Sequence, residues 1–185
     1  MLAALVAKGF NEAMGRRGWH QRGYLPHLDG HGIVQHVVFR LHDSVPPNAE
    51  HSGDDVLDRG FGSAVLSDPA LAEVVARTLL HHDGERYVLH AWCVMPNHVH
   101  VLMTTSEDHE LGAIVRSWKA YSARQINEAC ERQGRLWAAD YFDRYMRDDP
   151  HFWTSKAYIE NNPVAAGLCS RADEWRFSSA GWRGE

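Results

Sequence analysis

Residues 91–103 read Ala-Trp-Cys-Val-Met-Pro-Asn-His-Val-His-Val-Leu-Met, two apolar runs on either side of a Met-Pro-Asn corner. Proline and asparagine supply turn chemistry, and the β-branched and apolar residues around them favour strands. The pattern predicts a β-hairpin with one strand over 87–94 and the next over 98–105. Successive side chains point to opposite faces of a strand, so His98 and His100 share one face and the valine between them points to the other.

The two histidines make this hairpin a candidate metal site. They lie about 7 Å apart along the strand, so two imidazoles on one face can converge on one metal ion. A chain with 13 histidines contains a His-x-His pair about once by chance, so the spacing alone is weak evidence. The apolar flanks are stronger evidence for a metal site. They indicate a buried strand, and burying two unpaired polar side chains there would cost free energy.

The composition is that of a soluble globular chain, with 185 residues, 44% hydrophobic and 23% charged. This length suits one domain with its own core. The cysteines, Cys93, Cys130 and Cys169, lie far apart and form no Cys-x-x-Cys pair, which favours a reducing cytoplasm and argues against a zinc knuckle. No apolar run approaches a membrane span, and the apolar start at 1–7 is too short and lacks the basic residues of a secretory signal. We therefore expect a cytoplasmic protein that is not inserted in a membrane.

The charge of the chain does not point to a nucleic-acid-binding protein, because the net charge is −5. The distribution is uneven, however. Residues 1–110 carry 8 Lys and Arg against 14 Asp and Glu, whereas residues 111–185 carry 11 against 10. Any contacts with phosphate groups would therefore be local.

Hydrophobic spacing and helix-capping signals predict the other elements. Residues 1–23 are expected to form an irregular or partly helical arm, followed by a single domain over 24–185. A strand is predicted over 33–41, and alternation places His36 on the same face as Val38 and Arg40.

Three helices are predicted after that strand, and no element is predicted over 135–148. The first runs from Ser67 or Asp68, before Pro69, to about His82, and the second covers 111–130. The third runs from Asp149-Pro150 to about Asn161 or Asn162, just before Pro163, and a further turn over 164–168 stays open. The order of elements predicts an α+β fold, an antiparallel sheet with helices on one face. The aromatic tail at 175–182 is expected to pack back on the body.

Residues 95–102 resemble the His-hydrophobic-His segment of the single-tyrosine HUH transposases, in the branch called REP-associated tyrosine transposases. That family carries a tyrosine on a helix some fifty to sixty residues later. Here Tyr158 follows His100 by 58 residues. It begins the run Tyr-Ile-Glu-Asn-Asn-Pro-Val-Ala-Ala-Gly-Leu, which is similar to the family's Tyr-Ile-x-x-Asn-Pro-Val-x-x-Gly-Leu segment.

The resemblance extends over roughly residues 23–180. It includes Leu136-Trp137 with Tyr141-Phe142-Asp143-Arg144 and Arg147-Asp148, then Trp175-x-Phe177-Ser178-Ser179, and near the start Gly23–His27 with Phe39-Arg40-Leu41. It implies a ferredoxin-like HUH fold, an antiparallel sheet with helices packed on it and the catalytic tyrosine on a C-terminal helix.

The resemblance also implies an enzyme that nicks and joins single-stranded DNA at REP-like hairpins. Tyr158 would be the nucleophile and would form a 5′-phosphotyrosine link. His98 and His100 would bind Mg²⁺ or Mn²⁺, with Asn162, one helical turn after Tyr158, as a third ligand. A tyrosine hydroxyl, with a pKa of about 10, is a poor nucleophile at neutral pH, and a cation that polarises the phosphate makes it competent.

The DNA is expected to contact local basic and aromatic residues, namely Lys119, Trp137, Tyr141, Arg144 and Arg147. Tyr141 and Tyr145 are rival nucleophiles. Two other functions stay open: a hairpin-binding regulator on the same fold that does not cleave, and a His-x-His metallohydrolase unrelated to nucleic acids. The protein could act as a monomer or a homodimer.

Overall fold

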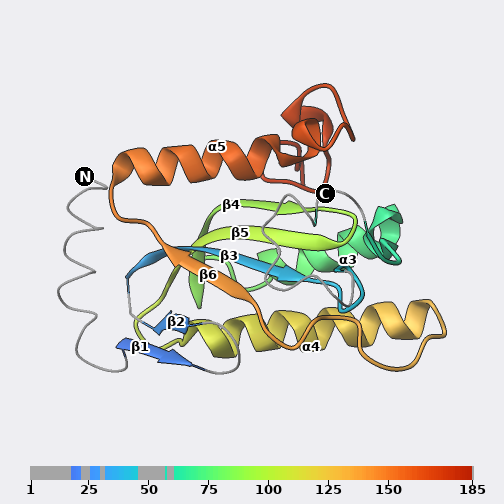
Figure 1. Cartoon of the computed structure of the whole chain (residues 1–185), viewed down its shortest axis with the longest axis horizontal. Helices are drawn as coiled ribbons and strands as arrows, with labels where there is room; N and C mark the ends of the chain where they lie inside the picture. Colours follow the sequence, from blue (N-terminus) through green and yellow to red (C-terminus); the bar gives the residue numbers. More distant parts are fainter. Residues whose placement is uncertain (1–17, 22–25, 30–31, 46–56, 58–60, 185) are drawn as a thin grey trace.

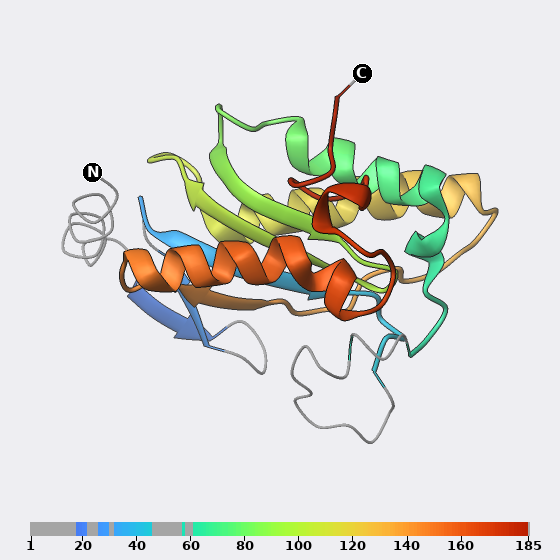
Figure 2. The same ribbon diagram turned by 90° about the horizontal axis from the view of Figure 1, so that it is seen from above.

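The computed structural model describes residues 18–21, 26–29, 32–45, 57 and 61–184. Within these residues the chain forms a four-stranded antiparallel sheet in the order β4-β5-β3-β6, three α-helices and a separate two-stranded sheet. Helix α5 covers one face of the larger sheet, and helices α3 and α4 cover the other (Figure 1, Figure 2). None of the helices in the described ranges is long and apolar enough to span a membrane.

The predicted hairpin is present, and both of its strands begin and end at the predicted residues. The larger sheet consists of β3 (Val34–Arg40), β4 (Tyr87–Val94), β5 (His98–Thr105) and β6 (Phe142–Tyr145). Strand β3 is one residue shorter at each end than the predicted 33–41. The α+β antiparallel fold is therefore confirmed.

The register between β3 and β5 brings a third histidine to the face of the sheet that carries His98 and His100. Val38 pairs with His100, and Arg40 pairs with His98. Directly paired residues point to the same face, so β3 contributes Arg40, Val38 and His36 to it. This face lies under α5.

A β-bulge in β4 changes which of its residues face each layer. Leu89 pairs with Met103, but the next pair joins Ala91 to Leu102, so His90 is the extra residue. Before the bulge the odd-numbered side chains of β4 point to the α3–α4 layer, and after it the even-numbered ones do.

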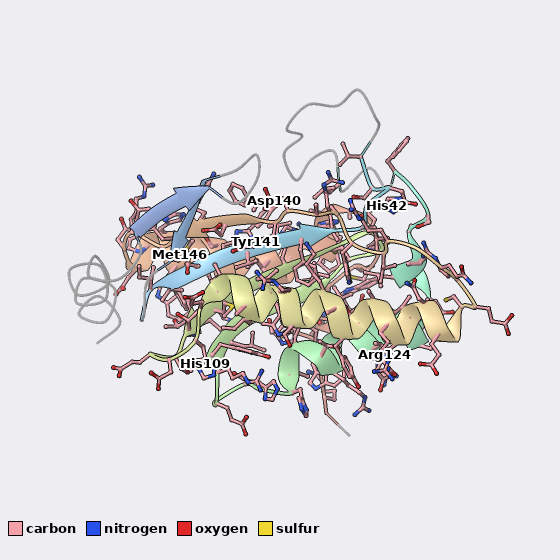
Figure 3. All side chains as sticks on the ribbon, turned by 90° about the horizontal axis from the view of Figure 1, so that it is seen from below. His42, His109, Arg124, Asp140, Tyr141 and Met146 are labelled. Atoms are coloured by element: carbon pink, nitrogen blue, oxygen red, sulfur yellow. The ribbon has the colours of Figure 1, made fainter. Side chains whose placement is uncertain are left out.

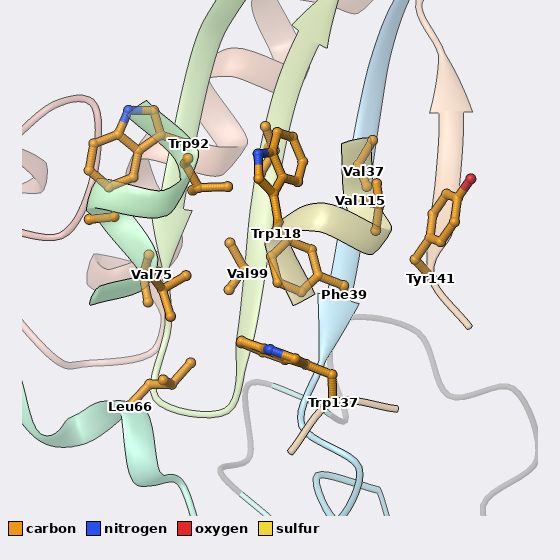
Figure 4. Packing of buried hydrophobic residues seen from close by; sticks show 14 of the residues in the cluster. Val37, Phe39, Leu66, Val75, Trp92, Val99, Val115, Trp118, Trp137 and Tyr141 are labelled. Carbon is orange, nitrogen blue, oxygen red and sulfur yellow. The ribbon is translucent and has the colours of Figure 1, made fainter. Parts of the chain in front are cut away.

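The larger core lies between the sheet and helices α3 (Pro69–Leu80) and α4 (Leu111–Ala129). The Phe39 ring packs against Trp118 and Trp137, with ring centroids 6.3 and 4.9 Å away (Figure 4). Both helices begin and end within two residues of the predicted positions. The predicted cap of α3 is confirmed, because the Asp68 carboxylate accepts a hydrogen bond from the Ala70 backbone N–H at 2.8 Å.

Helix α5 (Asp149–Ala165) packs on the opposite face over a smaller core that includes Leu102, Phe152 and Ile159. The prediction that helices cover one face only is therefore wrong. The apolar residues of β5 alternate between both faces, and each face needs a covering layer.

Three further predictions need correction. Helix α5 continues through Pro163, whose missing N–H removes a single bond near the last turn. Strand β6 lies in the stretch for which no element was predicted. Strands β1 (Gly18–Gln21) and β2 (Pro26–Asp29) pair within the expected arm and the segment after it, while residues 1–17 lie outside the described part of the chain.

The C-terminal segment packs back on the body, as expected, and pairs with the outer edge of β4 over residues 92–94. The Val94 N–H donates to the Phe177 carbonyl at 2.8 Å, and the Ser179 N–H donates to the Trp92 carbonyl at 2.9 Å. The Trp175 indole Nε1 donates to the Val94 carbonyl at 3.0 Å. A paired edge cannot join the edge strand of another chain.

Candidate active site

Tyr158 and the two histidines of the hairpin come together on the α5 face of the sheet. The Tyr158 ring stands edge-on to His100, with ring centroids 5.6 Å apart, and lies 6.3 Å from the ring of His36. His98 and His100 are fully buried, whereas Tyr158 is 40% exposed. The tyrosine is therefore the member of this group that a molecule in solution can reach.

The three histidines form one continuous hydrogen-bonded chain. His36 Nε2 lies 3.0 Å from His100 Nδ1, and His100 Nε2 lies 2.9 Å from His98 Nε2. His98 Nδ1 in turn lies 2.7 Å from Asn97 Oδ1. Each imidazole thus has a partner that can fix its orientation.

Asn97 sets the direction of the chain at its outer end. Its Nδ2 donates to the Leu57 carbonyl at 2.9 Å and to the Phe61 carbonyl at 3.3 Å. Its Oδ1 therefore faces His98 as an acceptor, which requires the hydrogen of His98 to be on Nδ1. The lone pair of His98 is then on Nε2 and points towards His100.

Burial keeps these imidazoles neutral at physiological pH. It lowers the pKa of His98 to about 3 and that of His36 to about 4, and the charges of Arg144 and His151 lower the His36 pKa further. The pKa of His100 is also held well below its usual value, first by burial and then by His98 and His36. A neutral imidazole has a free lone pair and can bind a metal ion.

The distance between the His98 and His100 Nε2 atoms suits two ligands of one cation. Neighbouring ligands of an octahedral ion at about 2.1 Å lie about 3.0 Å apart, and the two Nε2 atoms are 2.9 Å apart. Across the described ranges, no three His, Cys, Asp or Glu side chains form a group that could hold a metal ion. A third protein ligand in the described part of the chain would therefore be of another type.

Asn162 offers such a ligand. It is only 1% exposed, and neither its Oδ1 nor its Nδ2 has a hydrogen-bond partner among the described residues. Burying an unpaired amide costs free energy, whereas an amide oxygen is a suitable ligand for Mg²⁺ or Mn²⁺. The donor set of two imidazoles and one amide oxygen therefore fits the predicted cation.

The course of α5 places Asn162 towards the His98 end of the site. Phe152, near the start of α5, contacts His90 in the first half of β4, with ring centroids 5.3 Å apart. The helix therefore runs along β4 towards the hairpin turn. Asn162 lies one turn beyond Tyr158 on the same side of the helix, as the spacing predicted.

Two of the five residues predicted to contact DNA are exposed, and one of these, Arg144, lies beside His36. Arg144 pairs with His36 across β6 and β3 and so shares its face, and its guanidinium lies 5.6 Å from the centre of the Phe142 ring. Arg147 is exposed in the short connection between β6 and α5.

The other three, Lys119, Trp137 and Tyr141, lie on the α4 side of the molecule. Trp137 and Tyr141 are buried, and the Trp137 indole donates to Ser122 Oγ at 3.0 Å. Lys119 Nζ donates to the Ala139 and Asp140 carbonyls at 3.0 and 3.3 Å, in the connection that precedes β6 (Figure 3). All three hold the fold together here, and DNA contact through them stays a prediction.

The rival nucleophiles lie away from the histidines. Tyr141 belongs to the larger core, and Tyr145 pairs with Gln35, which points to the face opposite His36.

Sequence reasoning did not identify Asn97 as a partner of His98, because Pro-Asn was interpreted as turn chemistry alone. The alternation of the strand predicted which residues share a face with His36. The contact of His36 with His100 depends on the register between β3 and β5, which no local sequence signal specifies.

Comparison with known proteins agrees with this fold. The sequence profile of the family described as "Transposase IS200 like" matches residues 68–162, just over half of the chain, from the cap of α3 to Asn162. The chain belongs to this family of transposases, which are nucleic-acid-processing enzymes.

Individual relatives point to one branch of it. A Haemophilus influenzae protein assigned as a REP-associated tyrosine transposase is 28% identical over 113 residues, which are 56% of this chain and 62% of that protein. The chain thus spans less than two thirds of that relative. The solved structure of a REP-associated tyrosine transposase bound to a REP hairpin has the same fold, with a TM-score of 0.56, 18% identity, and coverage of 90% of this chain and 91% of that one. The resemblance seen in the sequence is confirmed.

Proposed function

We propose that this protein cleaves and rejoins single-stranded DNA beside a hairpin, with Tyr158 as the nucleophile. The observation that carries the proposal is the contact of a part-exposed tyrosine with two buried, neutral histidines: its ring centroid lies 5.6 Å from that of His100 and 6.3 Å from that of His36.

In the proposed reaction the Tyr158 oxygen attacks a backbone phosphorus atom. The bond from phosphorus to the 3′ oxygen of the preceding nucleotide breaks, and the tyrosine proton passes to solvent. The departing 3′ oxygen takes up one proton from solvent, so that nucleotide leaves with a free 3′-hydroxyl. The 5′ phosphate stays on the tyrosine, so a 3′-hydroxyl can attack it in the reverse step and rejoin the strand.

His98, His100 and Asn162 would hold the divalent cation, Mg²⁺ or Mn²⁺. Such a cation polarises the phosphate and stabilises the charge that develops on it. Burial of the two imidazoles excludes water from their lone pairs, and the hydrogen bond from His98 to Asn97 holds one ring in place. Asn162 joins this pair from the helix that carries the nucleophile.

Hairpin DNA is the proposed substrate because of the surface next to Tyr158 and because of the relative described above, which is bound to a REP hairpin. Arg144 and Arg147 provide positive charge, and the exposed Phe142 ring offers a face for stacking a base. The contacts with phosphate are thus local, in agreement with the charge distribution.

A cleavage assay tests the proposal directly. The protein is incubated with single-stranded hairpin oligonucleotides from repeats that flank its gene, with Mn²⁺, with Mg²⁺ or with a chelator, and a covalent protein–DNA adduct is sought on a denaturing gel. We expect a metal-dependent adduct that is lost in Tyr158→Phe and His100→Ala. Tyr121→Phe, which changes an exposed tyrosine on α4, is the matched control and should form the adduct normally.

The same assay separates the alternative functions. An adduct that survives Tyr158→Phe would refute the choice of nucleophile. Tight hairpin binding without an adduct in any metal would favour a regulator that does not cleave.

A further inference from the structure

The chain of histidines contains one residue that the proposed reaction does not use. His36 is buried on β3, and its Nε2 lies 3.0 Å from His100 Nδ1. This places it on the far side of the His100 ring from His98, whose Nε2 faces His100 Nε2 at 2.9 Å. His36 is therefore not positioned as a third ligand beside the two Nε2 atoms.

Without a cation, hydrogen bonding determines the tautomer of each ring. A neutral imidazole carries one N–H donor and one acceptor nitrogen. Asn97 requires the hydrogen of His98 on Nδ1, so His98 Nε2 must accept from His100 Nε2–H. His100 Nδ1 is then an acceptor, and His36 Nε2–H donates to it. Each of these contacts then joins a donor to an acceptor.

Cation binding requires the opposite arrangement at His100. Its Nε2 must offer a lone pair, so its hydrogen must be on Nδ1, where His36 Nε2 has to accept it. We infer that His36 is a positioning residue for the metal site, which stabilises the ligand tautomer of His100 and fixes the orientation of its ring. This inference rests on the proposed role of His98 and His100 as metal ligands.

The change of tautomer balances without a net gain or loss of protons. The proton on His36 Nε2 crosses to His100 Nδ1, and the proton on His100 Nε2 leaves to solvent. His36 then takes up one proton from solvent at its own Nδ1. A leucine at position 36 could not accept from His100 Nδ1–H, and a buried donor without an acceptor costs free energy.

Binding of Mn²⁺ alone, without DNA, tests the inference. Free Mn²⁺ is measured by electron paramagnetic resonance in titrations of the wild type, His36→Leu, His36→Gln and His100→Ala. Loss of a hydrogen-bond partner of a metal-bound histidine typically lowers metal affinity about 10- to 100-fold, and we expect His36→Leu to fall in this range. The glutamine amide oxygen can accept the same hydrogen bond, so His36→Gln should restore affinity to within about threefold of wild type.

His90→Leu is the matched control. His90 lies on the neighbouring strand β4, and its Nε2 contacts Thr104 Oγ1 at 2.7 Å, away from the three histidines. Its replacement removes a part-buried histidine hydrogen bond from the same sheet and should leave Mn²⁺ affinity unchanged. An equal loss in His90→Leu and His36→Leu would show a general effect on folding and would overturn the inference.

A spectroscopic measurement on the wild type does not depend on any variant folding. Nitrogen–proton correlation spectra of the imidazoles report which ring nitrogen carries the hydrogen. We expect the His100 hydrogen on Nε2 without metal and on Nδ1 with Mg²⁺. A His100 tautomer that does not change with Mg²⁺, or wild-type Mn²⁺ affinity in His36→Leu, would overturn the role of His36. Unchanged affinity in His100→Ala would instead refute the proposed metal site itself.

Discussion

Replacing Asn162 with leucine should make the metal-free protein more stable while it weakens metal binding. Asn162 is 1% exposed on α5, and neither polar atom of its amide has a hydrogen-bond partner among the described residues. Leucine has the same branched side-chain skeleton of four heavy atoms and no polar atoms. The substitution therefore removes the cost of an unpaired amide without leaving a cavity.

The size of this effect follows from two contributions. An unsatisfied buried polar group costs about 1–3 kcal/mol in mutational series. Leucine also favours a helix over asparagine by roughly 0.5 kcal/mol. Asn161→Leu is the control for the second contribution, because Asn161 is the exposed neighbour on the same helix, and the bond from its Nδ2 to the Ala157 carbonyl at 2.8 Å is open to solvent. The difference in unfolding free energy between the two variants should thus be about 1–3 kcal/mol in favour of Asn162→Leu.

Urea unfolding in the presence of a chelator measures this difference, and thermal melts should show a rise of about 2–4 °C for each kcal/mol. Mn²⁺ binding, measured in parallel, should be weakened in Asn162→Leu and unchanged in Asn161→Leu. If Asn162→Leu were less stable than Asn161→Leu without metal, the amide would have a native partner and the reasoning would be refuted.

Three further predictions concern acid stability, the cap of α3 and the C-terminal tail. Acid should destabilise the metal-free protein as the pH falls from 6.5 towards 4, because the unfolded chain takes up protons at the usual histidine pKa while His36 (pKa about 4) and His98 (pKa about 3) do not. At about 1.4 kcal/mol per pKa unit, His36 alone contributes about 3 kcal/mol to the free energy of unfolding at neutral pH. Urea unfolding at several pH values measures this, and a stability that does not change with pH would contradict it. Asp68→Ala should cost about 1 kcal/mol through loss of the α3 cap, with the exposed Glu107→Ala as control, and equal stabilities would show that the cap contributes nothing. Glu160→Ala removes the carboxylate that accepts hydrogen bonds from Lys156 Nζ and from Ser179 Oγ. The backbone amide of Ser179 should then exchange its hydrogen with solvent faster. An unchanged exchange rate would mean that backbone pairing alone holds the tail.

The parts of the fold predicted correctly are those with a local signal. The hairpin strands were delimited by the Met-Pro-Asn corner and by apolar runs, and α3 by Asp68 and Pro69. The hairpin pattern identified His98 and His100 as a candidate site, and the family resemblance added Tyr158 and Asn162; the roles of all four stay predictions. Spacing alone placed Tyr158 and Asn162 on one side of a helix and said nothing of where that helix packs.

The parts predicted wrongly or missed depend on distant contacts. Strand β6 is short and alternates aromatic with charged residues, so its pairing with β3 decides its structure. Helix α5 continues through Pro163 because the buried face from Phe152 to Asn162 packs on the sheet, which outweighs one lost hydrogen bond. The contact of His36 with His100 likewise exists only in the β3–β5 register.

The bulge at His90 gives β4 one residue more than its partner strand requires. Because this extra residue changes which residue numbers face each layer, Trp92 points into the larger core and Cys93 lies beneath α5. Deleting His90 would leave a regular strand with the same pairs, because Leu89 and Ala91 would then be neighbours opposite Met103 and Leu102. A second deletion would reverse the alternation, and an indole would then occupy the space of a thiol beside the histidines. A strand that is one residue shorter at this point is therefore expected to keep both of its faces, and a strand that is two residues shorter is not.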